Sequence, residues 1–167
     1  MPTCTLNGLT NDCGRYSAGV KYFWIGIYTS AATFDVTSGM VTGISGITYY
    51  KYEPAPNSAD WDDNGVGTTN SLGFTCTHTA NAFFAGNSAA KRNEMMLLSQ
   101  SKQSIIVEEL DGTLFLLGKD AGMWSTVEKY NSKKQGSDGG KGFDFTSVGE
   151  NSELADEVTD TTVFIHN

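Results

Sequence analysis

Cationic side chains and cysteines are scarce in this 167-residue chain, and each shortage excludes a class of protein. Eleven Lys and Arg stand against 19 Asp and Glu, which gives a formal net charge of −8. This balance argues against a nonspecific grip on nucleic acid or on an anionic membrane, because both depend on Lys and Arg. The three cysteines, Cys4, Cys13 and Cys76, cannot all pair with one another, so they do not form a disulfide framework.

Long apolar runs and targeting signals are missing as well. The longest apolar run is far too short to cross a bilayer. The opening residues, Met-Pro-Thr-Cys, lack a basic segment followed by an apolar one, so we expect no secretory signal peptide. We therefore expect a protein that is made in a reducing cytoplasm and has no contact with a membrane. Its length predicts one domain, residues 1–167.

Groups suited to catalysis are few. Of the two histidines, only His78 is placed where it could take part in catalysis. No candidate nucleophile lies in a recognisable catalytic sequence motif. The stretch GSDGGKG lacks the spacing of a phosphate-binding loop and precedes a strand instead of a helix. Glu108 and Glu109 are adjacent in a predicted strand and therefore point to opposite faces. We predict that the protein is not an enzyme and needs no cofactor.

The composition favours β-structure, since Thr and Gly each number 19. One helix is predicted at about 88–102, with Ser88 as its cap. An extended arm is expected at about 1–15. Strands are predicted at Val20–Tyr28, Phe34–Thr37, Ile47–Glu53, Ser71–Ala80, on both sides of Asp111-Gly112, and at Met123–Tyr130, Gly142–Val148 and Thr161–Ile165. This order predicts a mainly β fold, a two-sheet β-sandwich or open barrel with one flanking α-helix.

Residues 54–70 are predicted to form a loop that is much longer than a usual hairpin loop. Asp60, Asp62 and Asn64 follow the first half of an EF-hand calcium loop, but Ser71 stands where the bidentate Glu is expected. A looser calcium site at Asp60, Asp62 and Asn64 is the weaker alternative. The preferred interpretation is a partner-facing loop, because an exposed Trp61 needs a surface to pack against.

Cys76 and His78 alternate onto one face of a predicted strand, where both could contact a metal. A zinc ion would need two more ligands, and Cys4 and Cys13 are the other cysteines in the sequence. We prefer a buried thiol and a histidine at the end of a core face. The sequence therefore predicts no metal site here.

The stretch IIVEELDGTLFLLGKDAGM is followed by a strand, a Gly-rich loop and GFDFTSVGENSELADEV. This order resembles the tail tube (major tail) proteins of tailed bacteriophages. The shared features are an Asp-Gly hairpin, a Leu-Gly-x-x-x-Gly stretch at Leu117, Gly118 and Gly122, and an acidic stretch from Glu150 to Glu157. The motifs cover about residues 100–160, and the first hundred residues match in element order. The basic, Gly-rich segment 131–142 departs from the family pattern.

The resemblance implies a structural virion protein that is made in the bacterial host cytoplasm. Six copies would form a ring whose strands join into one inner barrel. The rings would stack into a tube around the tape measure protein and later carry phage DNA, with tail terminator or baseplate proteins at the ends. An acidic lumen would repel phosphates and let DNA slide. Asp60, Trp61, Asp62 and Asp63 would then belong to a self-assembly loop.

Two other classes remain open. A neighbouring virion part, such as a capsid decoration or tail completion protein, shares the acidic and β-rich profile. A calcium- or glycan-binding β-sandwich module would use the half calcium loop, or exposed aromatic side chains such as Trp61 and Tyr49.

Overall fold

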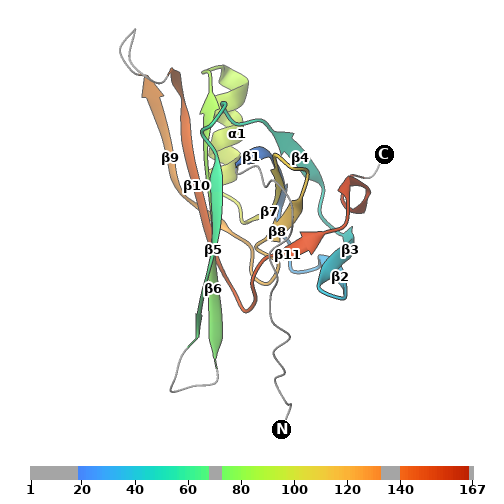
Figure 1. Cartoon of the computed structure of the whole chain (residues 1–167). Coiled ribbons are helices and arrows are strands. Elements are labelled where there is room, and N and C mark those ends of the chain that lie inside the picture. Colours follow the sequence, from blue (N-terminus) through green and yellow to red (C-terminus); the bar gives the residue numbers. More distant parts are fainter. Residues whose placement is uncertain (1–18, 68–72, 133–139, 166–167) are drawn as a thin grey trace.

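The described part of the chain is mainly β, with two sheets and one α-helix, and neither of these sheets closes into a barrel (Figure 1). A computed structural model describes residues 19–67, 73–132 and 140–165. The predicted arm at 1–15, Cys4, Cys13 and the end of the predicted loop, residues 68–70, lie outside the described residues. No helix of the described part of the chain is long and apolar enough to cross a membrane.

The larger sheet, sheet A, has seven strands. In spatial order they are β2 (Thr33–Thr37), β3 (Met40–Ser45), β11 (Asp156–Val158), β8 (Leu114–Leu117), β7 (Gln103–Glu109), β1 (Val20–Ile27) and β4 (Tyr49–Tyr52). Only the β3–β11 pair is parallel among the strand pairs of the described residues. Asp111-Gly112 forms the predicted hairpin turn between β7 and β8.

The smaller sheet, sheet B, has four antiparallel strands that are mostly longer. They are β5 (Asp60–Gly67), β6 (Phe74–Ala85), β10 (Lys141–Asn151) and β9 (Trp124–Ser132), in spatial order. Figure 1 shows sheet B as a tall layer on one side of the molecule, with sheet A across from it. Because β6 and β10 alternate strictly, one face of sheet B is buried and the other faces outward.

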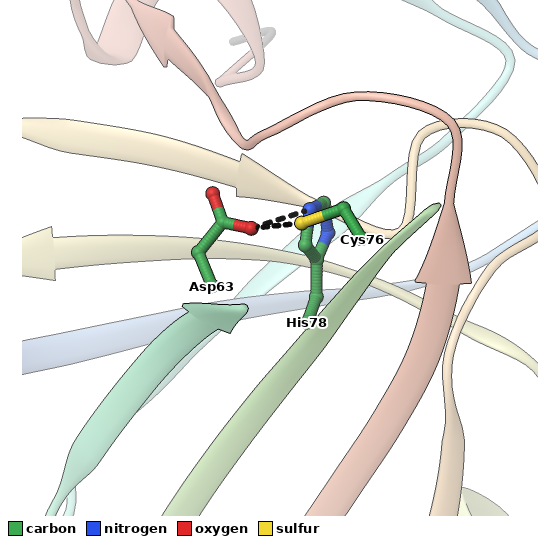
Figure 2. A group of neighbouring side chains, drawn as sticks. All are labelled: Asp63, Cys76 and His78. Carbon is green, nitrogen blue, oxygen red and sulfur yellow. Dashed lines mark hydrogen bonds and ion pairs between the residues drawn. The ribbon is translucent and has the colours of Figure 1, made fainter. Parts of the chain in front are cut away.

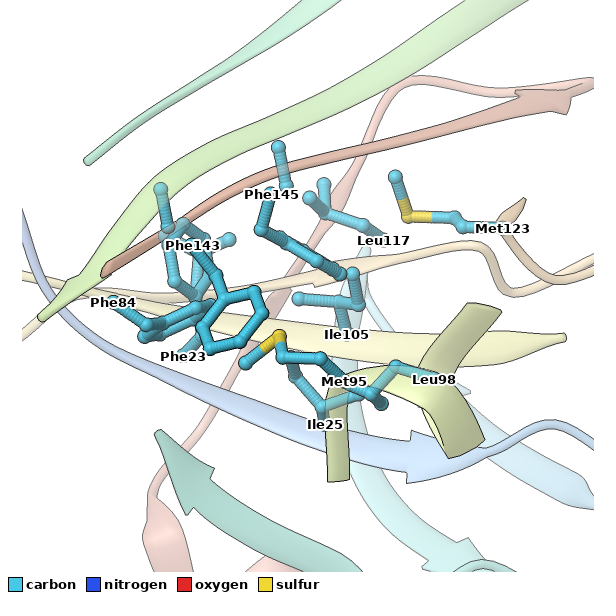
Figure 3. Packing of buried hydrophobic residues seen from close by; sticks show 13 residues of the cluster. Phe23, Ile25, Phe84, Met95, Leu98, Ile105, Leu117, Met123, Phe143 and Phe145 are labelled. Carbon is cyan, nitrogen blue, oxygen red and sulfur yellow. The ribbon is translucent and has the colours of Figure 1, made fainter. Parts of the chain in front are cut away.

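The core between the sheets is built from the inward residues of both (Figure 3). Phe143 and Phe145 point inward from β10, as their alternation predicts. Helix α1 (Ala89–Ser99) closes one side with Met95 and Leu98, and the predicted cap is confirmed, since the Lys91 N–H donates to Ser88 Oγ at 3.2 Å. Each large apolar side chain buried in this way stabilises the fold by about 1.5–3 kcal/mol.

Sheet A curls around a second core on its other face. This core joins Val41 and Ile44 of β3 to Tyr49 of β4, and the 3₁₀ turn η1 (Thr161–Val163) packs against it. Phe164 makes edge-on ring contacts with Tyr49 at a centroid distance of 5.6 Å. The curl explains the parallel β3–β11 pair, because the C-terminal part of the chain returns beside an early strand.

Two predictions of secondary structure are wrong. The predicted last strand, Thr161–Ile165, is η1 instead, and Asp160 caps it by accepting the Thr162 N–H at 2.8 Å. The predicted 54–70 loop contains β5, an eight-residue strand. The sequence of β5 is polar and has no apolar run typical of a strand. Strand β6 nevertheless pairs with every residue of β5. Strand β5 thus forms through pairing, a tertiary effect that outweighs local propensity.

Gly149 of β10 lies in close contact with the turn that follows β8. A methyl group on Gly149 would lie 2.7 Å from the Gly122 carbonyl oxygen and 2.8 Å from the Met123 side chain. Gly122 and Met123 belong to the turn that follows β8, residues 118–123, which we call the β8 turn. Backbone atoms cannot give way as a flexible side chain can, so the absence of a side chain at residue 149 permits this contact.

We therefore expect Gly149→Ala to lower the free energy of unfolding by about 1–3 kcal/mol, as overpacking does elsewhere. Gly67→Ala is the matched control, because Gly67 is also a strand glycine but nothing lies within 4 Å of an added methyl group. Urea unfolding of both variants measures the difference. Equal stability of the two variants would contradict a close approach at Gly149.

Candidate functional site

The outward face of sheet B carries polar side chains along its strands. Thr75, Thr77, Thr79 and Asn81 alternate outward along β6, opposite the buried residues of that strand. The outward acids are Asp60, Asp62, Asp144 and Glu150, and Lys129 lies across from Asp144 in the register. Figure 1 shows no element of the described chain covering this side of sheet B.

Hydrogen bonds cross this face from strand to strand. Asn81 Nδ2 on β6 donates to Asp60 Oδ1 on β5 at 2.6 Å, and Thr146 Oγ1 on β10 donates to Asn81 Oδ1 at 3.0 Å. At the other side of the sheet, Asn131 Nδ2 on β9 donates to Asp144 Oδ2. These bonds fix the rotamers of the outward side chains, so the face has a defined pattern of charge.

The half calcium motif belongs to this face. Asp60, Asp62 and Asn64 are exposed and alternate along β5. A strand rises roughly 3.3 Å per residue, so the backbone separates residues 60 and 64 by about 13 Å. A calcium ion collects oxygens at about 2.3–2.6 Å, which needs a tight loop in place of an extended strand. The period-two spacing in the sequence is that of a strand with one polar face.

We expect EDTA and added calcium to leave the thermal midpoint unchanged. A site filled at a hundred times its dissociation constant would stabilise the fold by about 2.7 kcal/mol, which thermal unfolding detects readily. A calcium-dependent rise in the midpoint that Asp62→Asn removes would restore the calcium interpretation.

Trp61 points the other way, into the molecule. Its ring lies 4.9 Å from the Phe115 ring between centroids, and its Nε1–H donates to Glu109 Oε1 at 2.9 Å. Trp61 is partly buried and therefore has a packing partner within the chain, and its role in contact with a neighbouring subunit stays a prediction. Of the four predicted assembly residues, Asp60 and Asp62 face outward, and Trp61 and Asp63 face inward.

Asp63 meets Cys76 and His78 beneath sheet B (Figure 2). One ligand-type atom from each of the three residues lies within 4.8 Å of the others. The thiol of Cys76 donates to Asp63 Oδ1, and His78 Nε2 lies 3.3 Å from the same oxygen. Cys76 and His78 are fully buried, and the Asp63 side chain is 14% exposed. The predicted buried thiol and core-facing histidine are confirmed.

The other ring nitrogen of His78 accepts two hydrogen bonds. The Gly118 backbone N–H donates to Nδ1 at 3.2 Å, and Asn151 Nδ2 donates to it at 3.0 Å. The orientation of the Asn151 amide is fixed, because its Oδ1 accepts the Asp120 backbone N–H at 3.2 Å. With two donors at Nδ1, the ring proton of a neutral His78 must reside on Nε2. That Nε2–H points to Asp63 Oδ1 and to the Glu153 carbonyl oxygen, 3.2 Å away.

This tautomer does not suit a metal ligand. A histidine that binds zinc through Nε2 carries its proton on Nδ1 and donates it to an acceptor. In His78, Nδ1 faces the N–H of Gly118, which cannot accept. Asp63 is also committed, since its Oδ2 accepts the Ala155 N–H at 2.6 Å. The three residues form a closed hydrogen-bond network, which we call the His78 network.

Burial sets the protonation of this network. Burial lowers the pKa of His78 against the opposing pull of the Asp63 carboxylate, so the neutral ring is favoured. Burial, together with the hydrogen bond to Asp63, raises the pKa of the Cys76 thiol to about 12. A thiol with such a pKa is a poor nucleophile, which agrees with a structural role for Cys76.

The network also holds the segment that crosses from sheet B to sheet A, residues 151–155, which we call the crossover segment. Ser152 donates to Asp120 Oδ2 through its backbone N–H at 2.9 Å and through its hydroxyl at 2.6 Å. Lys119 Nζ lies 3.0 Å from Glu153 Oε2 and 2.5 Å from Asp156 Oδ2. The acidic stretch that the sequence singles out thus includes a partly buried junction between the sheets.

Asp63→Asn should therefore destabilise the fold by about 1.5–3 kcal/mol, the range for hydrogen bonds to a charged group. In one orientation the new amide N–H₂ would face the donors of Cys76 and His78. In the other it would face the Ala155 N–H. Asp62→Asn, on the outward face of the same strand, is the matched control and should stay within about 0.5 kcal/mol of the native chain. Chemical denaturation of the pair tests this, and equal effects would refute the role of Asp63.

An apolar groove of about 790 Å³ lies between the free edge of sheet A and helix α1. Ile27, Tyr50 and Leu97 line it, and each is at least 60% exposed. Sequence reasoning missed this groove, because neither the strand nor the helix shows which of its apolar residues remain uncovered. The helix sequence contains one hint of the groove, the run of four apolar residues from Met95 to Leu98. A helix that packs on one side cannot bury all four, and Met96 and Leu97 are the two that stay exposed.

Comparison with protein families, with curated proteins and with solved structures finds no match to this chain.

Proposed function

We propose that this protein is the subunit of a phage tail tube and assembles into stacked rings. The observation that supports it best is the form of sheet B. Among the described residues its strand order ends at β5 on one side and at β9 on the other, eight and nine residues long. Long unpaired edges promote association, so such a sheet calls for a partner strand.

The strand directions of sheet B suit a closed ring. Three antiparallel pairings separate β5 from β9, so these two edges run in opposite directions. Rotation about an axis that lies roughly along the strands keeps each strand direction. The β5 edge of one copy would then meet the β9 edge of the next in antiparallel pairing, and the pattern would continue unbroken. A head-to-tail contact of this kind generates a ring when the rotation closes.

The outward face of sheet B would line the lumen of this ring. Threonine and asparagine side chains dominate it, with Asp60, Asp62, Asp144 and Glu150 against Lys129. A negative surface repels phosphate groups, so phage DNA would pass without binding. The tape measure protein would occupy the same lumen before DNA, and terminator or baseplate proteins would cap the ends of the tube. The protein would be part of the virion and not an enzyme.

The alternative of a glycan-binding β-sandwich module depends on exposed aromatic side chains at Trp61 and Tyr49. Trp61 is partly buried against Phe115, and Tyr49 is 7% exposed with its hydroxyl 2.8 Å from Ser104 Oγ, so neither is the fully exposed aromatic side chain that this alternative expects. A capsid decoration or tail completion protein is the runner-up. The groove at the β4 edge would serve either kind of virion protein as a contact surface.

Electron microscopy of the purified chain over rising concentration tests the proposal. We expect rings or tubes with a central hole, unchanged by EDTA. Discrete monomers at every concentration, together with no effect of the substitutions described next, would favour a decoration protein.

Cysteine pairs test which edges meet. We expect Asp62→Cys combined with Lys129→Cys, or a neighbouring outward pair on the same two strands, to give an intermolecular disulfide ladder that stops at the ring size. All variants carry Cys4→Ser and Cys13→Ser, which leaves the buried Cys76 as the one native cysteine. Each single substitution is the control, because one accessible cysteine can join two copies at most. Ladders from pairs placed on β2 and β4 of sheet A, and none from β5 and β9, would refute ring closure through sheet B.

A further inference from the structure

His78 stands where the two sheets meet. On one side, its Nδ1 accepts the N–H of Gly118, the first residue of the β8 turn. On the other, its Nε2–H points to Asp63 of β5 and to the Glu153 carbonyl in the crossover segment. One neutral imidazole therefore joins two strands of sheet B, a turn of sheet A and the segment between them.

A second proton has no place at Nδ1. It would face the Gly118 N–H, and Gly118 has φ +75° in a turn closed by a 3.1 Å hydrogen bond from the Gly122 N–H to the Gly118 carbonyl. Asn151 could turn its oxygen toward the new proton, but its Nδ2 would then face the Asp120 N–H. Protonation thus replaces two hydrogen bonds with two donor–donor contacts.

The charged groups around the His78 ring favour its protonation, in contrast to the two donors at Nδ1. The titratable and charged groups that surround His78 are Asp63 of β5, Cys76 of β6, Lys119 and Asp120 of the β8 turn, Glu153 of the crossover segment and Asp156 of β11. The carboxylates favour an imidazolium, and Lys119 offsets two of them by pairing with Glu153 and Asp156. Burial and the two donors oppose the charge. The balance of these effects favours the neutral ring.

We propose that His78 is an acid-sensitive switch at the contact between the sheets. In its neutral state it ties the β8 turn to sheet B, and when it takes up a proton on Nδ1 it releases that turn and the crossover segment. This inference concerns the single chain and does not depend on ring assembly.

The direction of the pH effect follows from linkage. The folded-state pKa of His78 lies below its ordinary value, so the unfolded chain binds the proton more tightly. The stability that the neutral ring confers is complete above the ordinary pKa and is lost as pH falls through the folded-state pKa. Each unit by which the pKa is lowered corresponds to a tenfold change in the opening equilibrium.

Nuclear magnetic resonance of the imidazole nitrogens in the full native chain tests the proposal directly. We expect Nδ1 unprotonated and Nε2 protonated at neutral pH, with a titration midpoint below that of an unperturbed histidine. His166→Gln removes the other histidine of the sequence and so assigns the signals. A proton on Nδ1 at neutral pH, or loss of the Nε2 proton on addition of zinc, would overturn the proposal.

Amide hydrogen exchange supplies the second measurement. As pH falls through the measured midpoint, the protection factors of the Gly118 and Ala155 amides should drop tenfold for each unit by which the His78 pKa is lowered. His78→Asn keeps an acceptor near the Nδ1 position but cannot titrate, so its protection factors should show no such step. If that variant does not fold, the native chain alone decides. Protonation of His78 with unchanged protection at both amides would refute the switch.

Discussion

The contact that the rest of the structure depends on is the one between Gly149 and the β8 turn. Gly149 pairs with His78 across β10 and β6, so the missing side chain lies beside the imidazole. The turn enters this space and presents the Gly118 N–H to Nδ1 of His78. Without that approach, Nδ1 of His78 would lose the Gly118 hydrogen bond, worth about 0.5–1.5 kcal/mol, and would keep the one from Asn151.

The same contact explains the motif on which the family resemblance depends. Gly118 and Gly122 both have positive φ of 75°, and the Gly122 N–H closes the turn on the Gly118 carbonyl. A side chain at residue 122 would meet the Tyr28 ring at 2.9 Å. The Leu-Gly-x-x-x-Gly spacing is thus a requirement of backbone geometry at the junction of the sheets. The acidic stretch that follows supplies the partners of Lys119.

The elements that could be predicted from the sequence have local signals. Helix α1 has a capping serine and good helix formers, the β7–β8 hairpin has Asp-Gly, and β10 alternates around Phe143 and Phe145. Strand β5 has no such signal, because its outward positions are mostly polar and the inward alternation consists of Trp61, Asp63 and two glycines. The His78 network could not be predicted either. Cys76 and His78 share a face in the sequence, but Asp63, Gly118 and Asn151 reach them only through sheet pairing and the β8 turn.

Strand β5 divides two tasks between its alternate residues. Trp61 and Asp63 hold the fold together, while Asp60, Asp62 and Asn64 touch no part of the core. The charge of the outward face can therefore change by substitution without loss of the fold, whereas an insertion of one residue would exchange the two sets and lose both. Natural variation along this strand should accordingly consist of point substitutions at residues 60, 62 and 64, with its length held constant.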